Sequence, residues 1–208
     1  HRPICVAEIL AVLAPQPGEV GLDATLGYGG HARELLARLS PGGRLFGVDV
    51  DPTEFARTEA RLRGLGFDAS ALILHRINFD GVSALLPEAG GGFDVILADL
   101  GVSSMQIDNP ARGFSFKTEG PLDLRLNQVS GQSASELLQS VTRAALRELL
   151  TDNADEPFAQ PPAAALQGQY LLERHRPMGL VADHDCNLAL LLGGLNQGCG
   201  ISHRHTTD

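Results

Sequence analysis

Four short runs of apolar residues alternate with amphipathic segments in the first hundred positions of the chain. The runs cover residues 20–25, 44–49, 71–75 and 93–99. Helices are expected over residues 3–13, 32–39 and 52–62, and a short helix is expected to end near Pro87. Nearly continuous apolar strands that alternate with helices indicate a parallel sheet with helices on both faces. We therefore predict an α/β, Rossmann-like fold that binds its ligand outside the carboxyl ends of the strands.

A glycine-rich loop joins the first predicted strand to the helix that follows it. Gly27, Gly29 and Gly30 lie in this loop, and His31 opens the helical pattern. Glycine permits positive φ angles and a close approach of ligand to backbone. The helix N-terminus behind the loop offers N–H groups to an electronegative part of a ligand. The loop alone is a weak signal, because a structural turn has the same composition.

Acidic and aromatic residues follow the other predicted strands. Asp49 ends the second strand, close to the spacing of about 20 residues after the loop at which an acid accepts hydrogen bonds from ribose hydroxyls. Phe79 follows the third strand and could pack on an adenine ring, although a core position is the alternative. Asp99 ends the fourth strand, where it could accept a hydrogen bond from an amine, stabilise a sulfonium, or cap the next loop. Together they favour a nucleoside-containing cofactor over bare phosphate.

Composition narrows the class of protein. The chain has 208 residues, 43% of them hydrophobic and 20% charged, which is enough for one domain or a domain with a subdomain. The net charge of −9 disfavours a protein that coats nucleic acid nonspecifically, but allows an enzyme with a local basic face. No apolar run is long enough to span a membrane, and three scattered cysteines indicate no disulfide framework. We therefore expect a cytoplasmic protein.

Three segments after the fourth strand resemble one protein family. They are Asp99-Leu-Gly-Val-Ser-Ser-Met-Gln-Ile-Asp108, Arg112-Gly-Phe-Ser-Phe-Lys117 and Gly120-Pro-Leu-Asp-Leu-Arg125. The chain is similar here to the bacterial small-subunit ribosomal RNA cytosine-N4 methyltransferases, which use S-adenosylmethionine. The same family pattern is matched by His1-Arg-Pro3, Asp23-Ala-Thr-Leu-Gly-Tyr-Gly-Gly-His31, Gly47-Val-Asp-Val-Asp-Pro52 and Glu156-Pro-Phe-Ala159. The resemblance covers about residues 1–160.

The resemblance implies particular site residues. The family's cofactor contacts fall on Gly29, Gly30, His31, Asp49, Phe79, Asp99 and Gln106. We expect Asp99 to act as the catalytic acceptor, with Ser103 and Ser104 shaping the base pocket. Arg112, Lys117 and Arg125 are the candidate RNA phosphate contacts, although scattered charges are also typical of a solvated loop.

The implied reaction moves a methyl group from a sulfonium to the exocyclic amine of a cytosine. The lone pair of that amine is delocalised into the ring, so the amine is a poor nucleophile. Catalysis is expected to come from alignment of amine, methyl carbon and sulfur, with Asp99 drawing on an N–H. The target base must leave its stack to reach the pocket. The expected partners are ribosomal RNA and the small ribosomal subunit.

The predicted organisation has three parts. Residues 1–104 form the cofactor-binding core, 105–160 begin a helical insertion that recognises the substrate, and 161–208 form a divergent tail. In the insertion, Ser133-Ala-Ser-Glu136 is a capping box that starts a helix through about Leu150. The later strands of the family's sheet are not recognisable, although Met178–Ala182 could form a strand and Cys186–Leu195 a helix. The His and Cys residues of the tail lack paired spacing, so no metal site is expected.

Two alternatives remain at this point. An incomplete sheet would leave a remnant that binds cofactor or RNA without turnover, with an open edge that a partner chain or a second copy covers. An NAD-dependent oxidoreductase shares the glycine loop and Asp49, but it does not explain residues 99–125.

Overall fold

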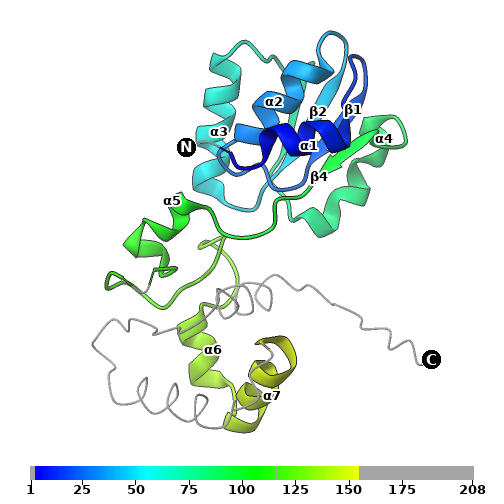
Figure 1. Cartoon of the computed structure of the whole chain (residues 1–208). Helices are drawn as coiled ribbons and strands as arrows, with labels where there is room; N and C mark the ends of the chain where they lie inside the picture. Colours follow the sequence, from blue (N-terminus) through cyan, green and yellow to red (C-terminus); the bar gives the residue numbers. More distant parts are fainter. Residues whose placement is uncertain (1–2, 116, 155–208) are drawn as a thin grey trace, which may run out of the picture. The chain divides into compact units, whose positions relative to one another are not determined.

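The computed structural model describes residues 3–115 and 117–154, and the chain divides into two compact units after Leu100. The first unit holds a parallel four-stranded sheet in the order β3-β2-β1-β4 (Figure 1). The strands are β1 (Val20–Asp23), β2 (Arg44–Val48), β3 (Leu72–His75) and β4 (Val95–Leu97). The predicted α/β, Rossmann-like sheet is thereby confirmed.

The register of the sheet aligns the carboxyl ends of its central strands. Asp23, the last residue of β1, pairs with Gly47 of β2 on one side and with Leu97 of β4 on the other. All three strands run in the same direction, so the residues that follow them emerge at the same edge of the sheet. That edge is where the sequence places its strand-end acids.

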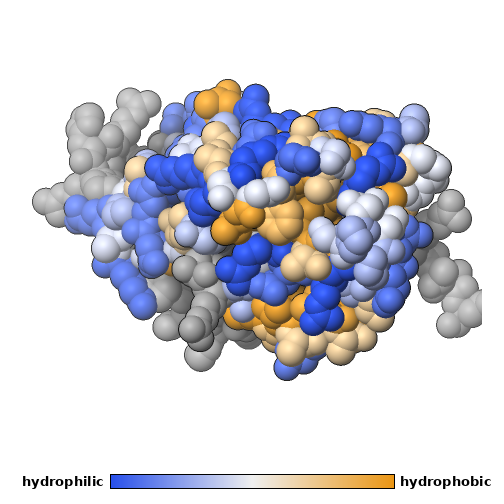
Figure 2. All heavy atoms as spheres, turned by 90° about the horizontal axis from the view of Figure 1, so that it is seen from above, coloured by the Kyte–Doolittle hydropathy of each residue, from blue (hydrophilic) through white to orange (hydrophobic). Residues whose placement is uncertain are grey.

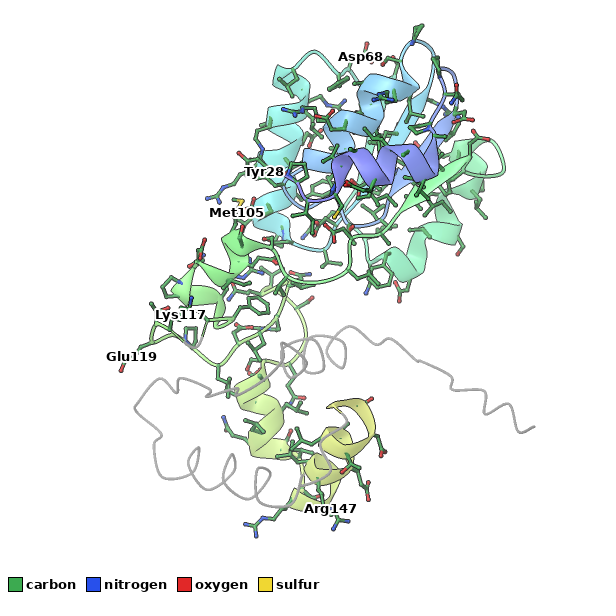
Figure 3. All side chains as sticks on the ribbon, viewed as in Figure 1. Tyr28, Asp68, Met105, Lys117, Glu119 and Arg147 are labelled. Atoms are coloured by element: carbon green, nitrogen blue, oxygen red, sulfur yellow. The ribbon has the colours of Figure 1, made fainter. Side chains whose placement is uncertain are left out.

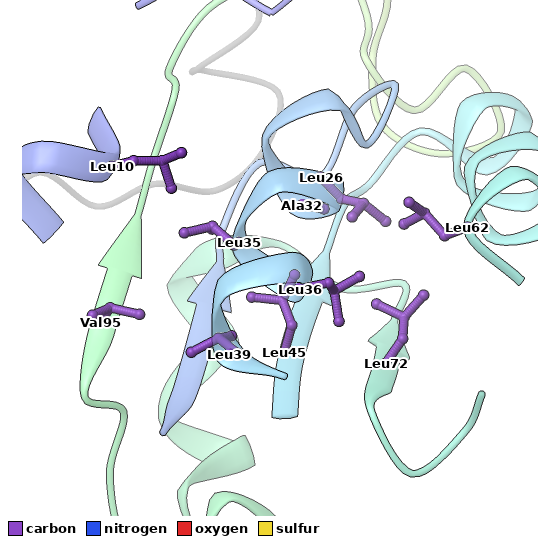
Figure 4. Packing of buried hydrophobic residues seen from close by; sticks show 10 residues of the cluster. All are labelled: Leu10, Leu26, Ala32, Leu35, Leu36, Leu39, Leu45, Leu62, Leu72 and Val95. Carbon is purple, nitrogen blue, oxygen red and sulfur yellow. The ribbon is translucent and has the colours of Figure 1, made fainter. Parts of the chain in front are cut away.

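Helices cover both faces of the sheet, as predicted. The helical elements are α1 (Val6–Leu13), α2 (Gly30–Leu39), α3 (Pro52–Gly64), the 3-10 helix η1 (Phe79–Leu85) and α4 (Leu86–Ala89). Helices α1, α2 and α3 contribute to one core, in which Leu36 packs with Leu45 and Leu72 of the sheet (Figure 4). The other core joins Phe46 of β2 to Leu85 at the end of η1. Burial on both faces explains the unbroken apolar runs of the strands.

Local capping signals set several helix boundaries. The Asp51 side chain accepts hydrogen bonds from the N–H groups of Thr53 and Glu54, and Pro52 lies in the first turn of α3. The short helix expected to end near Pro87 ends two residues later, because α4 continues to Ala89. Proline is tolerated there because it occupies the first turn, where its missing N–H breaks no helical bond.

The second unit contains short helices and small cores of its own. They are α5 (Ser104–Ile107), the 3-10 helix η2 (Pro110–Arg112), α6 (Ala134–Ser140) and α7 (Arg143–Ala154). The capping box of Ser133 and Glu136 starts α6, as predicted. The single helix expected through Leu150 is wrong: Val141 is extended, and the Thr142 hydroxyl accepts from the N–H of Ala145 at the start of α7.

Several predictions from the sequence concern residues outside those that the structure describes. They concern the opening His1-Arg, the Glu156–Ala159 segment, the strand and helix expected after residue 160, and the His and Cys residues of the tail. The predicted divisions 105–160 and 161–208 also extend beyond residue 154.

Large apolar side chains remain exposed at scattered positions of the described residues. On the face shown in Figure 2, hydrophobic and hydrophilic side chains are interspersed. Ile96 of β4 and Leu100 are among the exposed residues, at the edge of the described sheet. Within residues 3–154, leaving out 116, no helix combines the length and apolarity needed to cross a membrane.

We expect Gly43→Ala to destabilise the first unit by roughly 2–4 kcal/mol. A Cβ at Gly43 would overlap the backbone carbonyl oxygens of Leu39 and Glu19, the latter at 2.6 Å, and backbone atoms move only with the strand. Gly64→Ala is the matched control, because Gly64 ends α3 with no other atom within 4 Å of the added carbon. It is expected to be neutral or to stabilise by up to about 1 kcal/mol. Urea unfolding of both variants tests this, and equal midpoints would contradict it.

Candidate functional site

The glycine loop after β1 is a tight turn with fixed backbone conformations. The N–H of Gly29 donates to the carbonyl of Leu26 at 2.7 Å, and the φ angles of Gly27 and Gly29 are 45° and 77°. Both angles lie in the left-handed region, which other residues adopt at a cost of about 1 kcal/mol or more. The loop leads directly into α2, for which Gly29 is the N-cap without a side-chain cap.

Helix α3 holds the outer side of the loop. The Thr58 hydroxyl donates to the carbonyl of Gly27 at 2.6 Å, and Thr58 is fully buried. The Arg61 guanidinium donates to the carbonyl of Tyr28 at 3.0 Å and lies 3.6 Å from the centre of its ring. These contacts fix the loop before any ligand arrives.

Asp49 faces the same loop from the end of β2. One carboxylate oxygen accepts from the N–H of Gly27 at 2.7 Å, and the other accepts from the N–H of Asp51 at 2.9 Å. Burial raises the pKa of this carboxyl above its ordinary value, while the two N–H donors lower it. Asp49 therefore caps the loop, and each oxygen keeps a further lone pair for a ligand hydroxyl. Its predicted contact with ribose stays a prediction.

Asp23 is a buried acid that the sequence reasoning missed. It ends β1, is only 1% exposed, and accepts from the N–H of Thr25 at 3.1 Å. Burial raises its pKa from 3.8 to about 6, with smaller contributions from the charges of His31, Asp49 and Asp99. The sequence carries only a partial signal, an acid within the apolar run that precedes the glycine loop, and it does not show that this acid is buried.

Asp99 and His31 complete this edge of the sheet. The N–H of Asp99 donates to the Thr25 hydroxyl at 2.7 Å, which ties the residues after β4 to those after β1. The Asp99 carboxylate lies 3.8 Å from Nδ1 of His31, and Nε2 of His31 lies 2.9 Å from the carbonyl oxygen of Ile4. Three strand-end carboxylates and one imidazole therefore gather beside the glycine loop, where positive charge is favoured.

Phe79 is exposed at the start of η1, after the end of β3. Its exposed fraction is 41%, so it is not the plain core residue that the sequence allowed as an alternative. The side chain of the preceding Asn78 caps η1 by accepting from the N–H of Asp80. Phe79 is thus available to a flat ligand group, and its packing against adenine remains a prediction.

The other predicted site residues belong to the second unit, so their relation to these acids also remains a prediction. Gln106 is buried and forms a capping box with Ser103, in which its side-chain oxygen accepts from the Ser103 N–H at 2.9 Å. Arg112 is buried and donates to the carbonyls of Arg125 and Leu126 at 3.1 and 2.7 Å.

Two further cations differ sharply in their surroundings. Arg125 makes two hydrogen bonds to the Asp123 carboxylate, at 2.6 and 2.8 Å, and another to the carbonyl of Gly131. Arg112 and Arg125 therefore hold the segment between η2 and α6 together. Lys117 projects from the same segment as an exposed side chain near Glu119 in the sequence (Figure 3).

Comparison with known proteins identifies the family. The model of the MraW methylase family matches residues 1–178. The chain belongs to the MraW methylase family. Ribosomal RNA small subunit methyltransferase H 1 of Lachnoclostridium phytofermentans is 51% identical to this chain over 166 residues, which cover 80% of the chain and 45% of that relative. The predicted family resemblance is confirmed.

Two further relatives carry related names. Ribosomal RNA small subunit methyltransferase H 2 of Alkaliphilus metalliredigens is 54% identical to this chain over 157 residues, which cover 76% of the chain and 45% of that relative. Ribosomal RNA small subunit methyltransferase H of Leptothrix cholodnii is 40% identical over 195 residues, which cover 93% of this chain and 58% of that relative. The chain spans about half the length of the curated relatives it matches.

We expect Gly29→Ala to be destabilising and to be partly rescued by Thr58→Ser. A Cβ at Gly29 would lie 2.6 Å from Cγ2 of Thr58, and the φ of 77° adds strain of about 1–2 kcal/mol. Serine removes that methyl group but keeps the hydroxyl that holds Gly27. Urea unfolding of both single variants and the double variant gives the coupling free energy between the two substitutions. We expect the double variant to be more stable than the sum of the two single effects predicts. Strict additivity would contradict the packing described here.

We also expect Asp23→Asn to stabilise the chain at pH 7, by at most about 3 kcal/mol. The folded pKa is raised, so the wild type loses stability as the pH rises from about 4 to about 6. The advantage of the variant should therefore vanish as the pH falls to about 4. Asp68→Asn is the control, and we expect it to lower the free energy of unfolding at pH 7. Hydrogen bonds from Ser70 lower the pKa of exposed Asp68, so its charged form is the one that the fold favours. Asp68 also lies far from Tyr28 of the loop (Figure 3). Urea unfolding between pH 4 and 7 measures both; a pH-independent difference for Asp23→Asn would contradict the prediction.

Proposed function

We propose that this chain binds S-adenosylmethionine and methylates N4 of a cytidine in small-subunit ribosomal RNA, in the cytoplasm. The observation that carries the proposal is the convergence of Asp23, Asp49 and Asp99 beside the glycine loop. Membership of the MraW methylase family and relatives named as ribosomal RNA small subunit methyltransferases support it.

The charge of the site favours S-adenosylmethionine over NAD. Three carboxylates make this edge of the sheet strongly acidic, and His31 is the cation-forming side chain whose charge acts on Asp23. S-adenosylmethionine carries a sulfonium and an ammonium against one carboxylate, whereas NAD brings a negatively charged pyrophosphate. Opposite charges attract and like charges repel more strongly in a partly buried site than in water. The acids therefore fit the sulfonium cofactor.

The residues present can hold each part of that cofactor. Asp49 would accept from the ribose hydroxyls, and exposed Phe79 would pack against adenine. Gly29 and Gly30, at the start of α2, would let the cofactor approach the backbone and its N–H groups. We retain Gln106 as a cofactor contact from the second unit. When bound, the cofactor supplies an electrophilic methyl group.

Asp99 is the proposed catalytic residue of the chain. Its carboxylate is half-exposed, and its backbone N–H is fixed to Thr25. From this position it would accept a hydrogen bond from the exocyclic amine and localise the amine's lone pair, while the pocket aligns amine and methyl group. The target cytosine must leave its stack to reach it.

For RNA binding, we propose different roles for the three basic residues. Lys117 is exposed and suited to a phosphate contact. Arg112 and Arg125 would act indirectly, because their guanidinium groups hold the backbone of the segment that carries Lys117. Lys117→Ala should therefore weaken RNA binding without changing stability.

A binding module without turnover is the second candidate. Among the described residues, β4 pairs with β1 alone and exposes Ile96, so this edge could receive a partner chain or a second copy. This alternative predicts cofactor binding without methyl transfer, so the two functions are separable.

We expect titration calorimetry to show binding of S-adenosylmethionine and no binding of NAD under the same conditions. Asp49→Ala should weaken binding of the methyl donor at least tenfold, because it removes a carboxylate that faces the loop. Asp80→Ala, at an exposed acid of η1, is the control and should bind as the wild type does. Binding of NAD with equal affinity would contradict the proposed cofactor.

Methyl transfer to small ribosomal subunits and to naked ribosomal RNA tests the activity. Asp99→Asn keeps the shape of the side chain but loses its negative charge, so we expect turnover at saturating cofactor to fall about 100-fold, beyond any loss of cofactor affinity. An Asp99→Asn variant that binds the cofactor and methylates at the normal rate would remove Asp99 from the mechanism. Cofactor binding by the wild type without any methylation would favour the binding module.

A further inference from the structure

The imidazole ring of His31 is oriented through both of its nitrogen atoms. Nε2 lies 2.9 Å from the carbonyl oxygen of Ile4. A carbonyl oxygen can only accept, so Nε2 must carry the hydrogen in this contact. In the neutral ring, Nδ1 is then the basic nitrogen, and it lies 3.8 Å from the Asp99 carboxylate.

The N-terminal segment holds this arrangement in place. Pro3 packs against the start of α2, where a Cβ at Gly30 would lie only 2.9 Å from the proline ring. The carbonyl of the next residue, Ile4, is therefore presented to the first turn of the helix, where His31 lies. The contact joins residues 27 positions apart, so it does not follow from local helix geometry.

The two side chains differ in their access to solvent. The Asp99 side chain is 51% exposed, whereas that of His31 is 12% exposed. Asp99 is thus the more accessible of the two groups to a substrate amine, and the His31 ring is largely shielded from solvent. The separation of 3.8 Å exceeds a hydrogen bond, but such contacts often tighten when substrate binds.

Methyl transfer releases a proton from the amine and removes the positive charge of the sulfonium, and both events take place in the same pocket. The nitrogen–carbon bond forms as the carbon–sulfur bond breaks, and the electron pair of the broken bond stays on sulfur as a neutral thioether. The amine nitrogen must then release one proton. The carboxylates of Asp23, Asp49 and Asp99 would lose the cation they were facing unless that proton stays nearby.

We propose that His31 is the final acceptor of the released proton, which it receives at Nδ1 from the Asp99 carboxylate. This inference rests on the proposed methyltransferase function. The electrons of the broken N–H bond remain on the amine nitrogen, and the proton moves from Asp99 to the imidazole. The ring becomes an imidazolium as the sulfonium becomes a thioether, so the charge beside the acids is unchanged. The proton leaves to water after the products depart.

The tautomer of His31 gives a test that does not depend on activity. Nitrogen-15 NMR of the uniformly labelled chain should show neutral His31 with its hydrogen on Nε2, and the signal is assigned by its loss in His31→Gln. A neutral ring with its hydrogen on Nδ1 would overturn the inference, because Nδ1 could not then accept a proton.

Kinetics of His31→Gln give the second test. Glutamine can keep an N–H donor for the Ile4 carbonyl but has no basic nitrogen to face Asp99. We expect turnover at saturating cofactor to fall about 100-fold, with the KM for RNA and the unfolding midpoint close to those of the wild type. His75→Gln is the matched control, because His75 also pairs with an acid, Glu88 at 2.9 Å, but it should turn over normally.

The outcomes separate this inference from the proposed function. Normal turnover by His31→Gln, or a loss of turnover matched by losses of affinity and stability, would overturn the proton-acceptor role and leave the methyltransferase standing. A wild-type chain that binds no S-adenosylmethionine, or binds it and transfers no methyl group, would overturn both.

Discussion

Three carboxylates at the carboxyl ends of neighbouring parallel strands lie beside one glycine loop, and the rest of the site is arranged around that concentration of negative charge. Burial of an acid disfavours its charged form, and this is the main reason why the pKa of Asp23 is raised; the neighbouring charges of Asp49 and Asp99 add a smaller contribution. Backbone N–H groups of Thr25 and Gly27 offset part of this cost. A cationic ligand would offset more of the cost of these gathered carboxylates. The same acids that lower the stability of the folded chain therefore favour binding of a cation.

The loop can serve this purpose because it is fixed before a ligand binds. Thr58 and Arg61 of α3 hold its carbonyl groups on one side, and Asp49 holds the N–H of Gly27 on the other. A loop that is already ordered loses little further entropy on binding. The polar side chains of α3 therefore contribute to affinity without touching the ligand themselves.

Much of the fold could be predicted because its signals are local. The apolar runs gave the strands, and the Asp51-Pro52 and Ser133-Ala-Ser-Glu136 caps marked helix starts that the structure confirms. The break between α6 and α7 was missed, although Thr142 is a local signal of the same kind. Pro87 was read as a helix end because its position within the first turn of α4 depends on where that helix starts.

The candidate site was harder to predict where it depends on contacts between distant residues. Strand ends indicated Asp49 and Asp99, but Asp23 was read as part of a strand, and its burial could not be seen from the sequence. The hydrogen bond from Thr58 to Gly27 joins residues 31 positions apart, and no pattern along the chain announces it. Arg112 looked like a phosphate contact in the sequence, whereas the fold buries it against backbone carbonyls.

A crystal of the protein soaked with S-adenosylmethionine gives the most direct measurement of the site. We expect the ribose hydroxyls within hydrogen-bond distance of Asp49 and the methionine part beside the glycine loop, with Asp99 facing the methyl group. Cofactor density away from the loop, or Asp49 and Asp99 turned away from a common cofactor, would contradict it.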